Sequence, residues 1–254
     1  MKILKRVGAV VLIFVLVVLS AAGCSVEQLQ PPAEPPDGIY VPPSSEPEIE
    51  QTPSEKKVRE IDGLVALTDL DESIVVDLRY ATADNFTGQV IYPAAVAVLK
   101  RETAEKLVRA NQIFQEHGYT IKVWDAYRPL SAQAILWQAF PDSRYVIKPE
   151  DPPPVSGFRA RHNNGMSVDL TLVDRFGNEL EMPSAFDDFS EKAWPDSPDM
   201  SAAARQNLDL LRSVMESVGF AGVSTEWWHY NDVSGTPTPY QDIPLEAFLE
   251  PEPQ

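Results

Sequence analysis

Cysteine is almost absent from the 254-residue chain, and its scarcity limits the chemistry available to the protein. Cys24 is the single cysteine, so no intramolecular disulfide can form. A structural zinc site built on several cysteines is excluded for the same reason. Histidine is scarce as well, with 3 in the whole chain. Any metal site must therefore combine these few histidines with carboxylates.

Basic residues are also few, and the resulting charge argues against one class of partner. The chain has 21 Lys and Arg residues against 38 Asp and Glu, for a formal net charge of −17. Binding to nucleic acid or to anionic lipid headgroups needs clustered Lys and Arg. We therefore expect no nucleic-acid partner, and no sequence feature points to a protein partner. Hydrophobic residues make up 44% of the chain, which is typical of a globular protein with a core.

The N-terminal segment is too short for a transmembrane helix and has the pattern of an export signal. Basic residues within the first six positions precede an apolar run over residues 7–19. A spanning helix needs roughly 20 apolar residues, whereas a basic start, a short apolar run and a small-residue end are typical of a signal peptide. The run leads to Ala21-Ala22-Gly23-Cys24, which resembles the bacterial lipoprotein signal.

This resemblance implies that residues 1–23 are a lipoprotein signal peptide and that Cys24 is lipidated. Most such signals carry Leu where this chain has Ala21, a mild departure. A cysteine carrying more than one acyl chain gives firm anchoring, so we expect the protein at the outer face of the bacterial cytoplasmic membrane, attached through Cys24. The alternative is an incidental or buried thiol.

Residues 24–60 are rich in proline and acidic residues and predict a tether. Eight prolines lie between positions 25 and 60, together with eight acidic and three basic residues. Such a composition buries too little apolar surface to offset the entropy of ordering, and proline keeps the chain extended. The alternative is a small folded N-terminal subdomain.

Residues 61–254 mix helical and strand patterns and predict a single α+β domain with a central, mainly antiparallel sheet flanked by helices. The expected strands are 74–80, 120–125, 168–173, 179–182 and 220–230, and the expected helices are 95–117, 131–140 and 201–218. We expect Ser131 to be the N-cap of the second helix.

Asp169 is unusual because it is a carboxylate inside an apolar strand. A carboxylate on a sheet face needs solvent, a partner or a metal ion. His162 lies seven residues earlier, and the Asn163-Asn164-Gly165 turn between them lets the chain fold the histidine back beside the strand.

His229 supplies a second histidine, three residues after Glu226. Two histidines and an aspartate are the pattern of catalytic zinc, which keeps a fourth position for water. His162, Asp169 and His229 are therefore candidate metal ligands. A bend between Glu226 and His229 would let the glutamate act on water as a general base. Isolated loop histidines are more often hydrogen-bonding surface groups, and spacing alone leaves both interpretations open.

The motifs together resemble the zinc D-alanyl-D-alanine dipeptidases of the vancomycin-resistance type, within a wider D,D-peptidase family that includes D,D-carboxypeptidases and the hedgehog-like fold. The family pattern Ser-x-His-x-x-Gly-x-Ala-x-Asp and Glu-x-x-His is matched at His162, Gly165, Asp169, Glu226 and His229. Residues 78–88 and 125–129 resemble two further motifs of the dipeptidase branch. Ala160 replaces the family Ser, which helps to hold substrate, and Ser167 replaces the Ala.

The resemblance covers about residues 61–232 and implies zinc-dependent hydrolysis of the dipeptide D-Ala-D-Ala to two D-alanines. One Zn²⁺ per chain is expected on the three candidate ligands, with Glu226 as general base. The family match assigns Arg128 to the developing oxyanion; without it, Arg128 reads as a structural arginine paired with an aspartate.

The remaining assignments concern substrate contacts. Asp125 is expected to orient Arg128 or to bind the substrate ammonium. Tyr80 and Tyr92 are expected to line the dipeptide pocket, and their alternative is ordinary core packing. His117 ends a helix, where it complements the helix dipole and is not a ligand.

The sequence is also compatible with two other functions. One is a D,D-carboxypeptidase that trims peptidoglycan stem peptides, which uses the same metal set. The other is a non-catalytic, metal-dependent wall-binding lipoprotein, against which the presence of Glu226 speaks. An exported, tethered enzyme would scavenge or remodel wall-derived dipeptide outside the membrane.

The lipoprotein interpretation is tested with Cys24→Ser. We expect the unmodified chain to partition with membranes and the variant to be released or left unprocessed, because the substitution removes the lipidated thiol. Detergent-phase partitioning and apparent mass are the measurements. Unchanged partitioning of the variant contradicts the interpretation.

Overall fold

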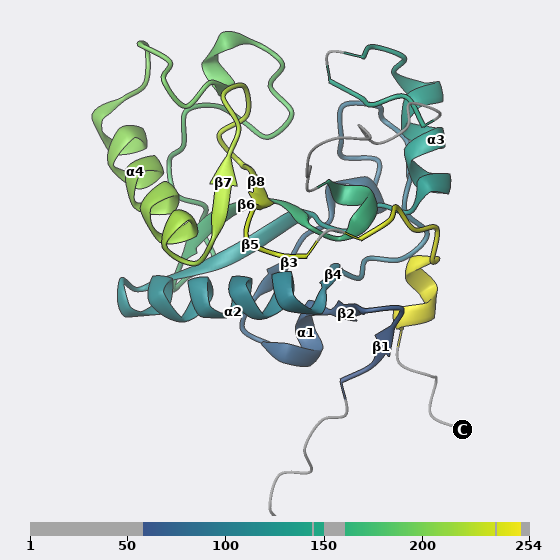
Figure 1. Cartoon of the computed structure of the whole chain (residues 1–254). Helices are drawn as coiled ribbons and strands as arrows, with labels where there is room; N and C mark the ends of the chain where they lie inside the picture. Colours follow the sequence, from purple (N-terminus) through teal and green to yellow (C-terminus); the bar gives the residue numbers. More distant parts are fainter. Residues whose placement is uncertain (1–57, 144, 150–160, 237, 250–254) are drawn as a thin grey trace, which may run out of the picture. The chain divides into compact units, whose positions relative to one another are not determined.

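The computed structural model describes residues 58–143, 145–149, 161–236 and 238–249 (Figure 1). The expected signal peptide, Cys24, nearly all of the tether and Ala160 lie outside the described residues. Within the described ranges, no helix combines the length and the apolar character that a membrane crossing requires.

Short strands form two sheets in the described part of the chain. They are β1 (Glu60–Ile61), β2 (Leu64–Ala66), β3 (Val75–Val76), β4 (Val98–Lys100), β5 (Tyr119–Asp125), β6 (Ser167–Asp174), β7 (Phe220–Gly222) and β8 (His229–Asp232). The larger sheet has the order β3-β5-β6-β8-β7 and the smaller one β1-β2-β4. The β3–β5 pairing is parallel and the other pairings of these strands are antiparallel. The expected α+β domain with a mainly antiparallel sheet is confirmed.

Helices flank this sheet. They are α1 (Leu67–Leu70), α2 (Arg101–Glu116), α3 (Leu130–Ala139) and α4 (Ala202–Ser217), with 3-10 turns η1 (Arg79–Ala81), η2 (His162–Asn164), η3 (Glu191–Ala193) and η4 (Leu245–Phe248). Figure 1 shows α2 and α4 beside the strands; α2 contacts β5, α4 contacts β7, and the two helices contact each other. Both bury an apolar stripe at helical spacing, as in Leu107 and Phe114 of α2. The Ser201 side chain caps α4 as N-cap.

Strand β6 separates the core from the site. Val168, Leu170 and Leu172 are fully buried in the hydrophobic core. Because side chains alternate along a strand, Asp169 and its neighbours two residues away point to the opposite face. The apolar residues thus determine which face of the sheet carries the carboxylate.

The N-terminal half departs from two predicted boundaries. The strand expected at 74–80 is only β3, because η1 begins at Arg79, within the expected range. The helix expected from residue 95 begins at Arg101, because Val98–Lys100 instead pairs with β2 as strand β4. That pairing is long-range, and helical periodicity alone does not reveal it.

The other departures lie near the site. The strand expected at 220–230 is two antiparallel strands, β7 and β8, joined by residues 223–228. Ser131 is not an N-cap; it lies inside α3, and its backbone N–H donates to Asp242 Oδ1 at 2.8 Å. The hairpin expected after β6 is reduced to one bridge, between Val173 and Glu179.

Gly165 is the one turn residue whose lack of a side chain brings η2 close to the smaller sheet. Its φ is +69°, and a Cβ there would lie 2.6 Å from Leu64 Cδ2 and 2.8 Å from the Lys100 nitrogen. Its carbonyl accepts from that nitrogen at 2.9 Å. This close approach fixes the turn between His162 and Asp169.

Gly165→Ala should therefore lower the free energy of unfolding by about 2–4 kcal/mol, from a positive φ plus overpacking. Gly177→Ala is the matched control: φ is +83° there, but nothing lies within 4 Å of the added Cβ, so about 1 kcal/mol is expected. Chemical denaturation measures both. Equal losses would refute the close-approach argument.

Candidate metal centre and catalytic site

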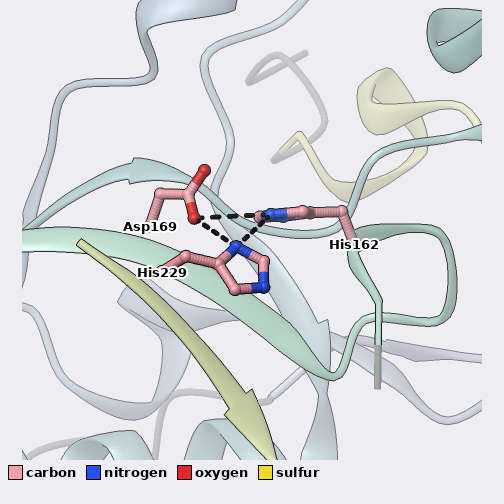
Figure 2. A group of neighbouring side chains, drawn as sticks. All are labelled: His162, Asp169 and His229. Carbon is pink, nitrogen blue, oxygen red and sulfur yellow. Dashed lines mark hydrogen bonds and ion pairs between the residues drawn. The ribbon is translucent and has the colours of Figure 1, made fainter. Parts of the chain in front are cut away.

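Three side chains from separate segments converge on one point of the sheet surface (Figure 2). Asp169 of β6 and His229 of β8 are direct partners in the antiparallel ladder, which places their side chains together on one face. His162 comes from η2, which folds back beside the strands as the turn sequence predicted. The three side chains are 11% (His162), 7% (Asp169) and 15% (His229) exposed, so the cluster is nearly buried.

The spacing of the donor atoms fits a tetrahedral metal ion. His229 Nδ1 lies 2.8 Å from Asp169 Oδ1 and 3.3 Å from His162 Nε2, and His162 Nε2 lies 3.4 Å from Asp169 Oδ1. Ligands about 2.0–2.1 Å from a tetrahedral zinc ion are separated by roughly 3.3 Å. The three donor atoms form a possible His-Asp-His metal site.

The second nitrogen of each imidazole is held by an acceptor. His162 Nδ1 donates to the carbonyl oxygen of Ala126 at 2.7 Å, and His229 Nε2 donates to Asn231 Oδ1 at 3.1 Å. These contacts orient the rings and leave His162 Nε2 and His229 Nδ1 facing Asp169. Such outer contacts are a regular feature of histidine metal ligands.

The contacts within this cluster shift the pKa values of His229 and Asp169. Burial by itself lowers the pKa of His229, but its hydrogen bond to Asp169 and the charge of that residue raise the pKa to about 9. Burial by itself raises the pKa of Asp169, but the charge of His162 and hydrogen bonds from both histidines hold it well below its usual range. A metal ion that binds through His229 Nδ1 would have to displace a proton held there.

Glu226 lies next to this cluster without joining it. Its Oε2 is 3.9 Å from His229 Nδ1, and the turn bond from the His229 N–H to the Glu226 carbonyl, 3.4 Å, makes the bend that the spacing required. Burial raises the pKa of Glu226 and the charge of Asp169 adds to it, against the attraction of His229. A carboxylate with a raised pKa, close to the donor atoms, is suited to accept and return a proton.

Arg128 is held by a buried network directly after β5. Its Nη2 pairs with Asp125, its Nε donates to the Tyr92 hydroxyl at 3.2 Å, and its Nη1 donates to Gln133 Oε1 at 3.0 Å. Burial by itself lowers the pKa of Arg128, but the charge of Asp125 raises it well above its usual value. The guanidinium therefore stays charged and fixed, with Tyr80 under its face at 5.2 Å.

A cavity of about 480 Å³ joins these groups. Its lining includes Tyr80, Arg128, Asp169, Asp187, Glu226 and His229. Asp125 is fully buried and is not among the residues that line the cavity. Its carboxylate accepts from Arg128 and, at 2.5 Å, from the Tyr92 hydroxyl. Of the three expected substrate contacts, Tyr80 thus lines the cavity, whereas Asp125 and Tyr92 lie behind Arg128 and orient it.

Sequence reasoning assigned no role to several polar residues of this cavity, among them Gln133, Asp187 and Asn231. Asn231 carried a usable signal, because it lies two residues after His229 and therefore on the same strand face. Asp187 carried none: it lies in a loop with φ of +57°, and only the fold brings it under the Tyr80 hydroxyl, at 3.2 and 3.3 Å from its carboxylate oxygens. Burial and the charge of Asp169 raise its pKa well above the usual range.

Three tryptophans and His117 remain to be placed relative to the cavity. Trp227 and Trp228 are 2% exposed, and Trp228 also lines the cavity, while Trp194 is 42% exposed. His117 is the C-cap residue of α2 and takes no part in the donor cluster.

An α+β domain carrying two histidines, an aspartate and an adjacent glutamate in one cavity has the arrangement of a metallopeptidase. The family model described as D-ala-D-ala dipeptidase (peptidase M15) matches residues 60–246. The chain belongs to this family.

Curated relatives agree over most of the chain. A D-alanyl-D-alanine dipeptidase of Escherichia coli (strain K12) is 36% identical over 188 residues, covering 74% of this chain and 94% of the relative. One from Enterococcus faecium is 33% identical over 201 residues, covering 72% and 98%. A solved LD-carboxypeptidase structure matches at a TM-score of 0.37 and 14% identity over 69% of this chain and 70% of that one; a likeness this low bears on neither substrate nor mechanism.

The donor set is tested by metal content. We expect His162→Ala to lose the bound metal, because two remaining protein ligands hold a dication poorly. His117→Ala, which removes a histidine outside the cluster, should keep it. Elemental analysis of both purified proteins beside the parent is the measurement. Full metal content in His162→Ala would show that the ligand assignment is wrong.

Proposed function

We propose that this protein is a zinc-dependent dipeptidase that hydrolyses D-Ala-D-Ala to two D-alanines. The observation that carries the proposal is the meeting of three metal-donor atoms with Glu226 and Arg128 in one cavity. Membership of the D-Ala-D-Ala dipeptidase family supports the substrate. Zinc is the metal we assign, because a two-histidine, one-carboxylate set with room for water is its usual catalytic environment.

Proton transfer falls to Glu226. When bound, zinc supplies Lewis-acid polarisation of the scissile carbonyl and makes water easier to deprotonate. Glu226 accepts the proton of the attacking water and then delivers it to the leaving amine. Its raised pKa suits both steps, because a base that is too weakly basic would not hold the proton long enough to return it.

Charge stabilisation falls to Arg128. Its guanidinium is already fixed by Asp125, Tyr92 and Gln133, so it needs no reorganisation when negative charge develops on the carbonyl oxygen. Each of its nitrogens donates to one of these partners, which leaves further N–H groups of the terminal nitrogens for the substrate.

Asp187 provides the argument for a dipeptide. It lines the cavity, accepts from Tyr80, and forms no ion pair with a Lys or Arg of the described residues. A buried carboxylate in this position gains from a cation. A dipeptide has a free ammonium next to its single peptide bond, whereas a stem peptide has a neutral amide there. Asp187 therefore favours the dipeptidase over the D,D-carboxypeptidase, because the ammonium of a dipeptide would stabilise its ionised form against the burial that raises its pKa.

We further propose that the enzyme is exported and anchored through lipidated Cys24, and that it acts on wall-derived dipeptide outside the membrane. The signal-like N-terminus and the proline-rich tether support this location. A non-catalytic wall-binding lipoprotein is disfavoured, because a binder needs the metal ligands but has no use for a general base beside them.

Glu226→Gln separates the base from the ligands. The amide keeps the shape of the side chain but has no useful proton affinity, so kcat should fall by about 10²–10⁴ while zinc is retained. Glu216→Gln is the control, because Glu216 is exposed on α4, and it should keep full activity. D-Ala-D-Ala turnover is measured beside zinc content of the same preparations.

The same assay includes a pentapeptide stem as second substrate. Hydrolysis of the dipeptide alone agrees with the proposal, and preferred release of the terminal D-alanine from the stem would replace it with a carboxypeptidase. Loss of zinc from Glu226→Gln would make Glu226 a ligand. Full activity in that variant would assign the base to another group.

A further inference from the structure

Two successive cross-strand pairs share the site face of the β6–β8 ladder. Asp169 is opposite His229, and Ser167 is opposite Asn231. Residues two apart on a strand point the same way, so the second pair lies directly beside the metal ligands. Ser167 is fully buried, and a hydrogen bond offsets the free-energy cost of burying its hydroxyl.

The second pair is linked to the first through one oxygen atom. Asn231 Oδ1 accepts from Ser167 Oγ at 2.7 Å and from His229 Nε2 at 3.1 Å. Two donors therefore meet on the same carbonyl oxygen. Turning the amide over would set its NH₂ group against the N–H of His229, two donors facing each other.

We propose that Asn231 and Ser167 are positioning residues for the metal centre: Asn231 keeps the proton of His229 on Nε2, and Ser167 keeps the Asn231 oxygen turned toward it. With Nε2 protonated, the lone pair of Nδ1 faces Asp169 and His162, where the metal is expected. The inference rests on the metal centre of the proposed function, and not on its substrate.

Ser167 departs from the family motif described above. The family pattern has Ala where this chain has Ser167, and Ala cannot hydrogen-bond to Asn231. Ser167 therefore adds a support for His229 that the general motif does not contain. Partners of this kind commonly contribute 10–100-fold in metal affinity.

Zinc affinity measured without substrate tests the inference on the full chain, by competition with a chromophoric chelator. Asn231→Leu should weaken binding by about 10–100-fold, and Ser167→Ala by about 3–10-fold, the effect of one hydrogen bond. Asn231→Asp keeps an acceptor for His229 and should retain the parental affinity. In the Asn231→Leu background, Ser167→Ala should cause no further loss of zinc affinity, because the Asn231 oxygen that Ser167 bonds to is absent.

Thr171→Val is the matched control. Thr171 lies on the same face of β6, two residues beyond Asp169; its hydroxyl is buried and bonds to none of the described residues. Removal of the Thr171 hydroxyl should leave zinc affinity unchanged. The control therefore distinguishes the loss of any buried hydroxyl on this face from the loss of the Ser167–Asn231 hydrogen bond. Far-UV circular dichroism of each variant checks that it folds.

Imidazole ¹⁵N shifts of the zinc-loaded protein give a second readout. The parent should show His229 protonated at Nε2, with that signal altered in Ser167→Ala and Asn231→Leu but not in Thr171→Val. Unchanged affinity and shifts in folded Asn231→Leu would overturn the inference, as would additive effects of the two substitutions. Absence of zinc from the parent overturns the proposed function as well, whereas zinc binding without dipeptide hydrolysis overturns only the proposed substrate.

Discussion

The register of β6 against β8 is the constraint on which the rest of the site depends. A slip of one residue would turn Asp169 and His229 to opposite faces of the sheet. The register is held from the other side, where Val168, Leu170 and Leu172 are fully buried. Burial of such side chains stabilises a fold by roughly 1.5–3 kcal/mol each. The apolar core therefore determines where the metal donors stand, although none of its atoms takes part in the chemistry.

The neighbouring strand, β5, determines where the Arg128 guanidinium lies. Asp125 of β5 is the ladder partner of Asp169, and a register shift between Val123 and Asp125 leaves Trp124 unpaired. Bulges of this kind redirect side chains beside active sites. Here the result is that Asp125 is buried behind the cavity, where it pairs with Arg128. The position of Arg128 thus depends on β5, which pairs with the strand that carries Asp169.

How much the sequence predicts differs from element to element for physical reasons. Strands β5 and β6 and helix α4 carry clear periodicity, so their positions were predicted closely. Strand β4 was missed because three residues have no period of their own and depend on pairing with β2. The grouping of His162, Asp169 and His229 was predicted from the resemblance to a family motif made of short local segments, because spacing alone left it open. Asp187 was not, because its place in the cavity depends on a left-handed loop conformation and on Tyr80, far away in sequence.

Two ionisable side chains of opposite type, Arg128 and Asp187, line the cavity. Arg128 is a buried cation, and Asp187 is a buried acid that forms no ion pair with a Lys or Arg of the described residues. Buried charges are costly unless an opposite charge or hydrogen bonds offset them. A small zwitterion such as a dipeptide brings a cation for Asp187 and acceptor oxygens for Arg128 at the same time. A longer peptide has its terminal ammonium too far from the scissile bond to do this. The proposed selectivity for a dipeptide therefore depends on the pairing of its ammonium with Asp187.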